Sequence, residues 1–419
     1  MLVWTFLLSG LAVTRAENVA MTSSGTAVFT SEGRLFVATP DSEPVQVDSE
    51  VVTDNDLGFS DVAIDPANEA LVFALSTDSQ IVCLFELDEA AGTLREPTCR
   101  GDRFSVSPFS GVAANGGTLV ISGGTGGLTV YTYDPQTGLM QGGPIVLNLE
   151  ESNVIGHPDV TLVSPSLAAL STDFSGGGAR FGTQMATIDG GSVVFGADFR
   201  VEDSLGFDLA LGPANFPLVN AVFEGRYMYT ANGAMQVQDL ETGEVRVLDP
   251  RSELVELAEA TCGGLQSCED FFNEEFQAVT VAVNEARQAV VFGVLDESGG
   301  TGIIYFGLEK DPMSPTRFAL LEINLTARIT SIATGGDVLA YVESDMGAVI
   351  TFLDLPDPLP ESDHTDDADH TNDDATGDDA NATDDENVTG FPPVDDLTDG
   401  ARGRRAAFAV AACAVALAF

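Results

Sequence analysis

Positive charge is scarce in this sequence. Of its 419 residues only 17 are Lys or Arg, and Lys310 is the single lysine, whereas 65 are Asp or Glu, so the formal net charge is −48. Proteins that bind nucleic acids neutralise phosphates with clustered Lys and Arg, and here the arginines are scattered. The composition therefore excludes a nucleic-acid partner. Because 44% of the residues are apolar and 20% are charged, the chain still has enough apolar material for a large core.

Residues typical of catalytic motifs are also few. No Gly-x-Ser-x-Gly, His-Glu-x-x-His or Cys-x-x-Cys motif occurs. His157 is the only histidine before the acidic C-terminal region, so a Ser-His-Asp triad has one possible centre. If His157 lies beside Asp159 at the end of a channel, the pair predicts a general base or a metal ligand. The alternative is a surface loop without a chemical role.

One segment resembles the start of a calcium loop. Asp54-Asn-Asp56 places three oxygen ligands shortly before Gly58, but the twelfth position, where such loops carry Glu, is Asp65. A polar turn between repeats explains the same residues. We therefore predict no cofactor, with calcium at Asp54 and Asp56 as the only candidate ion.

The longest apolar runs lie at the two ends. Residues 2–13 are apolar and precede Thr14-Arg15-Ala16, which predicts a signal peptide over residues 1–16. Residues 406–419 are apolar and follow an Arg-rich stretch, but a helix of that length rises only about 21 Å, short of the roughly 30 Å of a bilayer core. We expect residues 401–419 to be a GPI-type anchor signal, or alternatively a short transmembrane anchor, so that the protein is held at the outer face of the plasma membrane.

An acidic segment precedes this tail. Residues 361–399 contain fifteen Asp or Glu and no Lys or Arg, so residues 356–400 are expected to form a disordered stalk. Glycosylation sequons begin at Asn324, Asn381 and Asn387. Four cysteines outside the tail suit an oxidising compartment, and we predict the disulfides Cys83–Cys99, across one hairpin, and Cys262–Cys268, closing a small loop.

A repeated pattern fills residues 17–355. Seven segments combine a short alternating strand, a tight turn rich in Gly or Asn, and a second apolar strand. In most units a third apolar strand and a further turn follow this hairpin. We therefore predict that each unit forms a four-stranded antiparallel sheet. The anchoring hairpins lie at residues 26–38, 61–73, 111–121, 185–195, 220–229, 281–292 and 332–341.

We therefore predict an all-β, seven-bladed β-propeller over residues 17–355. Six or eight blades remain possible, because Val160 to Phe174 could form an extra strand pair or a partial blade. The last unit is one strand short, so we expect the N-terminal strand at residues 18–21 to complete it and close the ring. Residues 249–275 form an insertion, read as a disulfide-pinned helix that either binds a partner or covers the end of a blade.

One turn carries a family resemblance. At Tyr131-Thr-Tyr-Asp134-Pro-Gln-Thr-Gly138-Leu139 the chain resembles the lactonase-like, YVTN-type propellers. That resemblance would imply a phosphogluconolactone substrate, but residues 17–355 hold 49 acidic and 13 basic side chains, and a net charge of −36 repels anions. The repeats of WD40 and kelch propellers need tryptophans, and Trp4, the only one, lies in the signal peptide.

These observations favour a binding module over an enzyme. We expect a secreted, surface-anchored propeller that recognises an extracellular protein or glycan through its loops. The competing function is a lactonase-like or other metal-assisted hydrolase that uses His157 and neighbouring carboxylates at the channel. The sequence leans against an enzyme and leaves that class open.

Overall fold

The structure is a computed structural model that describes part of the chain. The described residues are 18–54, 57–76, 80–101, 111–122, 128–142, 144–147, 154–156, 159–174, 181–189, 192–200, 219–231, 233–248, 276–296, 301–315, 317–325, 329–343 and 350–357. The sequence predictions for the signal peptide, the acidic segment beyond Asp357, the C-terminal tail, Asp56, His157, Cys262, Cys268, Asn381 and Asn387 lie outside them. Among the residues described, no helix is long and apolar enough to cross a membrane.

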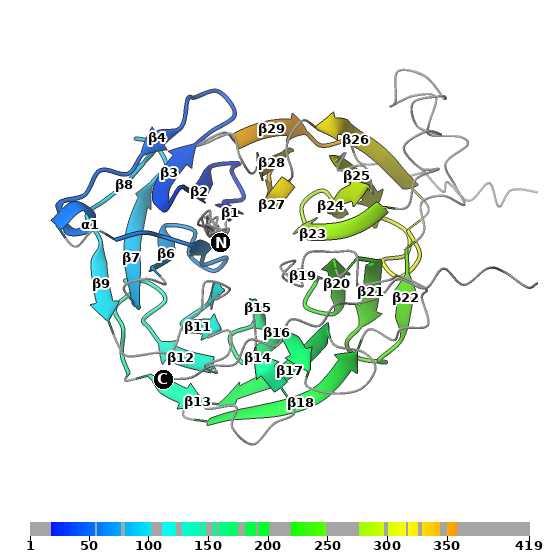
Figure 1. Cartoon of the computed structure of the whole chain (residues 1–419), viewed down its shortest axis with the longest axis horizontal. Helices are drawn as coiled ribbons and strands as arrows, with labels where there is room; N and C mark the ends of the chain where they lie inside the picture. The colour runs from blue at the N-terminus through cyan, green and yellow to red at the C-terminus, as the bar shows by residue number, and fades with distance from the viewer. Residues whose placement is uncertain are drawn as a thin grey trace, which may run out of the picture. The chain divides into compact units, whose positions relative to one another are not determined.

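Seven antiparallel sheets form a ring, which confirms the predicted seven-bladed propeller (Figure 1). Blade 1 contains β1 (Val19–Met21), β2 (Ala27–Ser31), β3 (Arg34–Ala38) and β4 (Val45–Gln46); the helix α1 (Glu50–Asp54) follows it. Blade 2 contains β5 (Asp61–Ile64), β6 (Leu71–Ser76), β7 (Ile81–Asp88), β8 (Thr93–Leu94) and β9 (Thr98–Gly101). Blade 3 contains β10 (Val112–Asn115), β11 (Thr118–Ser122), β12 (Leu128–Thr132) and β13 (Ile145–Leu147).

The remaining blades follow in chain order. Blade 4 contains β14 (Val154–Gly156), β15 (Val160–Ser164), β16 (Leu167–Phe174), β17 (Phe181–Asp189) and β18 (Ser192–Arg200). Blade 5 contains β19 (Val219–Phe223), β20 (Tyr227–Ala231), β21 (Met235–Asp239) and β22 (Val245–Val247). Blade 6 contains β23 (Phe276–Asn284), β24 (Ala289–Asp296), β25 (Thr301–Gly307) and β26 (Arg317–Leu325). Blade 7 contains β27 (Ile329–Gly335), β28 (Val338–Glu343) and β29 (Ile350–Asp354).

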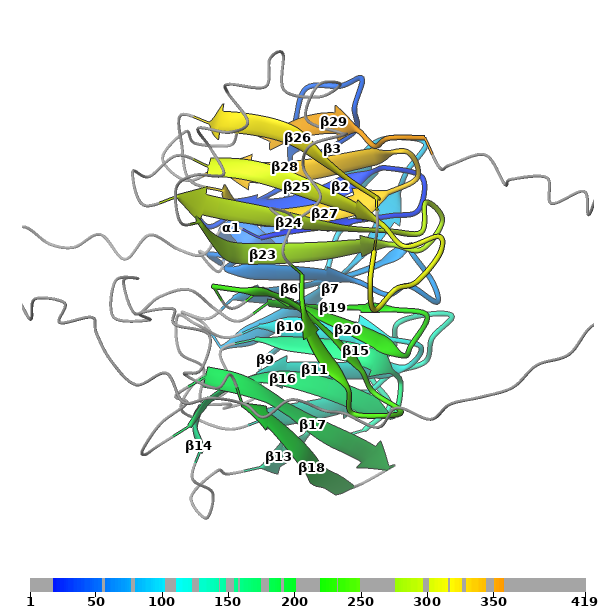
Figure 2. The same ribbon diagram turned by 90° about the vertical axis from the view of Figure 1, so that its right-hand side faces the viewer.

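Alternating side chains fill the spaces between neighbouring blades. In the side view the strands run roughly along the axis of the ring, so each blade presents both faces to its neighbours (Figure 2). Leu75 of blade 2 and Leu119 and Tyr131 of blade 3 are fully buried in one such cluster, and the other blade pairs are joined in the same way. The core of the propeller is therefore a series of apolar layers between sheets, as the period of two in the sequence predicts.

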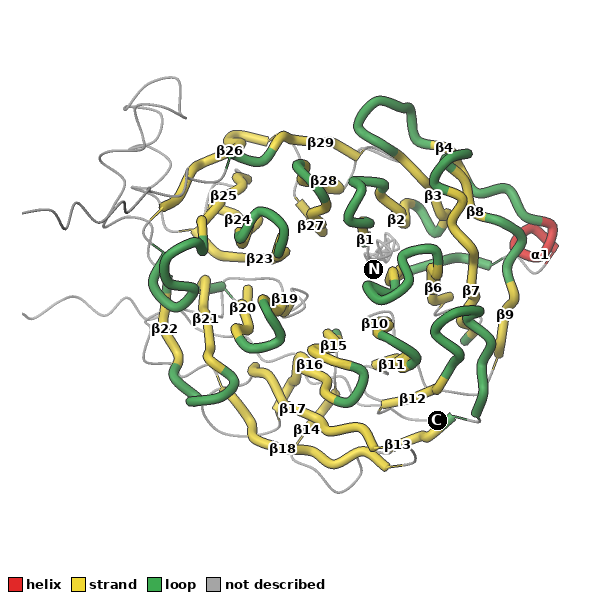
Figure 3. The backbone as a smooth tube through the Cα atoms, turned by 180° about the vertical axis from the view of Figure 1, so that it is seen from behind, coloured by secondary structure: helices red, strands yellow, loops and turns green. Residues whose placement is uncertain are grey.

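The tight turns have the predicted backbone geometry. Gly116 and Gly117, between β10 and β11, have φ of 50° and 100°, which glycine adopts at little cost. Seen from the back, such turns between the innermost and second strands are the loops nearest the centre (Figure 3). One end of each innermost strand therefore lies at this face, and the other end lies at the face shown in Figure 1.

Blade 4 explains the unequal spacing of the repeats. Val160 to Phe174 is no separate blade, because β15 and β16 pair with each other and β16 pairs with β17. The hairpin at residues 185–195 is consequently the outer pair of blade 4, not its inner pair. Both β14 and β15 pair with β16, so the inner edge of this sheet is split into two short strands.

The prediction that the N-terminal strand completes the last blade is wrong. β1 pairs with β2 of its own blade, with Val19 opposite Phe29. The turn between them is closed by hydrogen bonds from Thr22 N to Thr26 O (2.9 Å) and from Gly25 N to Thr22 O (3.0 Å), so a local hairpin forms without a long loop. Blade 1 packs against blade 7 through apolar side chains, and Val19 N donates a hydrogen bond to Ser331 Oγ (3.2 Å).

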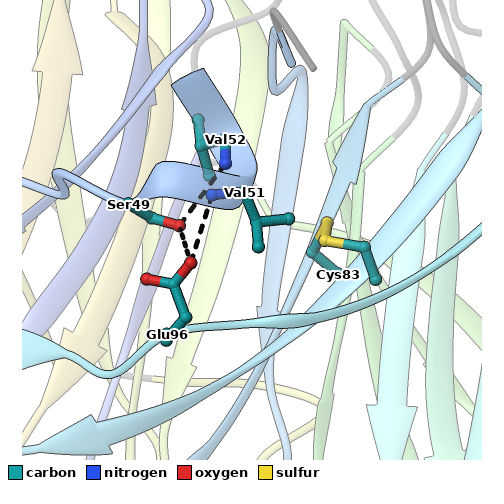
Figure 4. The surroundings of a disulfide bond; sticks show 6 residues. Ser49, Val51, Val52, Cys83 and Glu96 are labelled. Atoms are coloured by element: carbon teal, nitrogen blue, oxygen red, sulfur yellow. Dashed lines mark hydrogen bonds between the residues drawn. A yellow bond between two sulfur atoms is a disulfide. The ribbon is translucent and has the colours of Figure 1, made fainter. Parts of the chain in front are cut away.

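The disulfide Cys83–Cys99 is present as predicted. The two cysteines lie directly opposite each other on β7 and β9, with Cα atoms 4.0 Å apart. Nearby, Glu96 Oε1 accepts hydrogen bonds from Ser49 Oγ (2.9 Å) and Val51 N (3.1 Å), which holds the N-terminus of α1 against blade 2 (Figure 4). The sequence analysis did not predict this helix.

Candidate functional site

Two carboxylates lie at the beginnings of innermost strands. Asp61 is the first residue of β5, and Asp159 directly precedes β15. The two occupy the same position in the repeat, because each is followed by a valine, Val62 or Val160, that packs toward the preceding blade. Gly111 holds this position in blade 3, where Val112 follows it. Blades 2 and 4 therefore carry a carboxyl on either side of a glycine in blade 3.

Asp61 is 7% exposed and joins blades 2 and 3. Its Oδ1 accepts a hydrogen bond from Val62 N (2.8 Å), and its Oδ2 accepts one from Val112 N, the first residue of β10 (2.6 Å). Both oxygens are thus occupied by backbone amides. Such a carboxyl positions the two strands and is poorly placed to attack a substrate.

Asp159 approaches the same place from blade 4. Its Oδ1 accepts a hydrogen bond from Val160 N (2.8 Å). A Cβ atom added to Gly111 would lie 2.5 Å from this oxygen, so only the missing side chain of Gly111 makes room for the carboxyl. Gly111 itself is held by a bond from its N to Ser122 Oγ (2.7 Å). The carboxyls of blades 2 and 4 thus converge on the start of β10.

Burial shifts both carboxyls toward the protonated form. Burial raises the pKa of Asp61 well above its usual value, the charge of Asp159 raises it further, and the backbone amides of Val112 and Val62 oppose the shift. Burial raises the pKa of Asp159 to about 7, against the bond from Val160 N. Asp159 can therefore donate or accept a proton near neutral pH.

The prediction of a catalytic pair at His157 and Asp159 is not tested. Asp159 lies in the cluster, whereas its predicted partner His157 is outside the described residues. Its described neighbour is Asp61, which the sequence analysis did not single out. The signal that could have found Asp61 is the Asp-Val pair that begins the innermost strand in both blade 2 and blade 4, Asp61-Val62 and Asp159-Val160.

The calcium prediction is not tested. Asp54 is the last residue of α1, and Asp56 lies outside the described residues. In the parts of the chain that the structure describes, no three His, Cys, Asp or Glu side chains gather as a metal site would require. Asn324, in the first predicted sequon, lies in β26 at a register shift between Leu325 and Ile323.

A second acidic network lies at the opposite end of β5. Asp65 is fully buried; its Oδ1 accepts bonds from Ala67 N and Gly116 N (both 2.9 Å), and its Oδ2 accepts one from Tyr133 OH (2.6 Å). Every oxygen has a partner, so this network fastens blade 2 to blade 3. The twelfth position of the supposed calcium loop is therefore structural.

Intramolecular ion pairs occupy several arginines. These are Arg95 with Glu86 (2.9 Å) and Asp88 (3.3 Å), Arg226 with Asp239 (2.7 Å) and Glu241 (3.0 Å), Arg246 with Glu244 (2.8 Å), and Arg287 with Asp337 (2.6 Å) and Asp357 (3.3 Å). These seven carboxylates surround only four guanidinium groups, and most of the carboxylates are exposed. The acidic excess of the sequence is therefore present at the surface even where arginines lie.

Comparisons with known proteins support the fold alone. No known protein family matches the sequence, and no curated protein is similar to it, so the resemblance to lactonase-like propellers stays a prediction. Among solved structures, the chain is similar to "Kuenenia stuttgartiensis Hydrazine Synthase", with a TM-score of 0.51, 13% identity and coverage of 84% of this chain and 99% of that one. It is also similar to a chain of "Crystal Structure of Mitotic Checkpoint Complex", with a TM-score of 0.50, 10% identity and coverage of 82% and 90%.

Proposed function

We propose that the protein is a binding module whose acidic propeller recognises a basic protein partner outside the cell. The observation that carries the proposal is the surface charge: residues 17–355 have a net charge of −36, and several arginines are already paired with carboxylates of the propeller itself. A field of one sign steers partners of the opposite sign and repels anions. A glycan is the alternative ligand, and salt would affect its binding little if it is neutral.

The test separates the propeller from the acidic segment that follows it. The full-length chain is titrated with a peptide of alternating arginine and threonine and with its aspartate-containing counterpart, at low and high salt. We expect binding of the arginine peptide only, with affinity falling at least about tenfold at high salt. The control variant carries amides in place of the fifteen acidic residues at 361–399. If that variant no longer binds, the acidic segment and not the propeller is the binding element, and the proposal fails.

Presentation on the outer face of the plasma membrane is part of the same proposal. It rests on the apolar ends of the sequence and on the Cys83–Cys99 disulfide, which suits an oxidising compartment. Antibody labelling of intact cells that express the chain, followed by treatment with a phospholipase that cleaves GPI anchors, distinguishes the two forms of attachment. Release supports a GPI anchor, labelling without release supports a transmembrane anchor, and no labelling overturns the proposal.

A second candidate function, a hydrolase of uncharged lactones or esters, rests on Asp159. Its pKa of about 7 is near that of an effective general base, and Asp61 lies beside it. The screen uses wild-type protein and Asp159→Asn, with and without added calcium, zinc or manganese. Turnover that the variant loses supports this function, and absence of turnover by the wild type removes it.

A further inference from the structure

Blade 7 differs from the others at its outer edge. In the part of the chain that the structure describes, β29 is the third strand of this sheet and no strand pairs with its outer side. Every other sheet continues at least one strand further. The N-terminal strand, which could have filled the place, is used as the innermost strand of blade 1. Figure 1 shows β29 at the outer rim, between β26 and blade 1.

The side chains of β29 are also less covered than those of other third strands. Residues 350–353 are half-buried, and Asp354 is exposed, whereas β25 of blade 6 is buried along its whole length. Ile350 and Phe352 pack toward blade 1, and Leu353 packs toward blade 6. Residues 350–353 therefore place apolar side chains on both faces of the strand and carry none of the charges that commonly protect an edge strand.

The backbone polarity of this edge follows from the register. Val338 pairs with Asp354, so Leu355 lies opposite Asp337, and Leu355 N donates to Asp337 O (2.8 Å). Hydrogen-bonded and non-hydrogen-bonded pairs alternate in an antiparallel ladder. Leu353 and Thr351 therefore bond to β28, whereas Phe352 and Asp354 direct their N–H and C=O groups outward.

The charge at the end of β29 is negative. Asp337 and Asp357 share one guanidinium, that of Arg287, and Asp354 lies on the same end of the strand. The side chains of Asp337 and Asp357 are 77% and 96% exposed. Two carboxylates on one arginine, together with Asp354 at the same end of the strand, leave an acidic surplus next to the open edge.

We infer that the outer edge of β29 receives an extended segment of a partner protein as an antiparallel fourth strand, with basic residues flanking an alternating apolar core. Main-chain bonds to Phe352 and Asp354 supply the pairing, and the apolar side chains extend the two layers beside blade 7. This inference rests on the proposed binding function and gives it a location.

Charge decides between this occupant and two others. The chain's own residues 361–399 carry fifteen acidic and no basic side chains, and they would add to the acidic surplus. A second copy would bring together two propellers, each with a net charge of −36. A basic segment of another protein would instead be attracted to the acidic end of β29, so we favour it over both acidic occupants.

The test uses the full-length chain and a peptide, Arg-Arg-Val-Thr-Val-Thr-Val-Arg-Arg, with a control in which the central Val is Pro. The two peptides have the same charge, but the control cannot pair as a strand. Among protein variants, Asp354→Ala keeps the outward N–H, and Asp354→Pro removes it. Because the N–H at residue 354 takes no part in the β28–β29 ladder, we expect the two variants to have similar melting temperatures.

We expect the proline peptide to bind at least about tenfold more weakly than the strand peptide. Asp354→Pro should bind the strand peptide about tenfold more weakly than Asp354→Ala, the loss expected for one main-chain bond and a blocked approach. Hydrogen exchange at Phe352 and Asp354 should be fast in the free protein and slow in the complex.

Four results would overturn the inference. Equal binding of both peptides by all variants places the basic ligand elsewhere on the propeller, and the proposed binding function survives. Protection of Phe352 and Asp354 in the free monomer shows that the chain itself covers the edge. A dimer that Asp354→Pro dissociates shows that a second copy covers it. No binding of either peptide, or of the arginine and threonine peptide, removes the binding function and the inference together.

Discussion

Tyr133 donates a 2.6 Å hydrogen bond from its hydroxyl to Asp65 Oδ2 across the boundary between blades 2 and 3. Both residues are buried, with exposures of 2% and 0%. Burial, with the nearby carboxylate, raises the pKa of Tyr133 well above its usual value, so the hydroxyl stays protonated as a donor. This bond joins the end of a third strand to the turn of the neighbouring blade.

Removing that donor should weaken the junction. We expect Tyr133→Phe to lower the free energy of unfolding by about 2 to 3 kcal/mol, because Asp65 Oδ2 loses its partner in a buried place. The matched control is Tyr229→Phe, which loses a bond to the carbonyl oxygen of Pro312 (2.7 Å) and should cost about 1 kcal/mol. Denaturant unfolding of both variants measures the difference, and equal losses would show that the carboxylate adds nothing.

The carboxyls of Asp61 and Asp159 should make stability depend on pH. In the folded protein the pKa of Asp159 is about 7, above the value of about 4 in an unfolded chain, so between those pH values the folded state holds more protons. The stabilising contribution of this group is therefore complete below about pH 4 and is lost as the pH rises through 7. Asp159→Asn, which keeps an acceptor for Val160 N, should be more stable than wild type at pH 8 by about 1 kcal/mol or more.

Melting temperatures at pH 5 and pH 8 test this expectation. The gain of Asp159→Asn should shrink at pH 5, and Asp189→Asn, at an exposed position on the same blade, is the control for the substitution itself. A gain for Asp159→Asn that is the same at both pH values would show that its carboxyl is not shifted.

The space beside Gly111 can be tested by a double-mutant cycle. Gly111→Ala should destabilise the propeller by about 1 to 3 kcal/mol, because the new methyl group collides with Asp159 Oδ1. In an Asp159→Ala background the loss should be smaller, although Asp159 Cα, 3.1 Å from the added Cβ, still crowds the site. Additive effects of the two changes would contradict the contact.

Removal of the disulfide should be costly. Cys83 and Cys99 are separated by 16 residues, so Cys83→Ala with Cys99→Ala should lower the free energy of unfolding by about 3 kcal/mol. Replacing Cys262 and Cys268 serves as the comparison, because the predicted shorter loop should be worth only about 2 kcal/mol. Mass spectrometry of unreduced peptides shows whether that second bond forms.

Local features were the most predictable from the sequence. Gly116 and Gly117 marked a turn because the required positive φ values depend on those two residues alone. Cys83 and Cys99 were assigned correctly because the hairpin that joins them is short. The number of blades followed from the repeat itself, once β15 and β16 are placed in blade 4.

Features that depend on neighbouring blades were not predictable. The sequence could not show that Val19 pairs with Phe29 in preference to a strand more than 300 residues away. It also could not place Asp61 near Asp159, because their meeting depends on the packing of three sheets and on the missing side chain of Gly111. A single sequence shows where strands lie. It does not show which residues of neighbouring sheets meet, because that depends on the strand register within each sheet.

The local pairing of β1 has a consequence for biosynthesis. Since the two ends of the described ring share no strand, every blade consists of consecutive residues and can form as soon as its own segment has left the ribosome. No early strand has to wait unpaired for the last blade to be translated. The final step is the docking of blade 7 against blade 1, and the seam at Val19 and Ser331 is where the finished ring would be expected to open first under mechanical load.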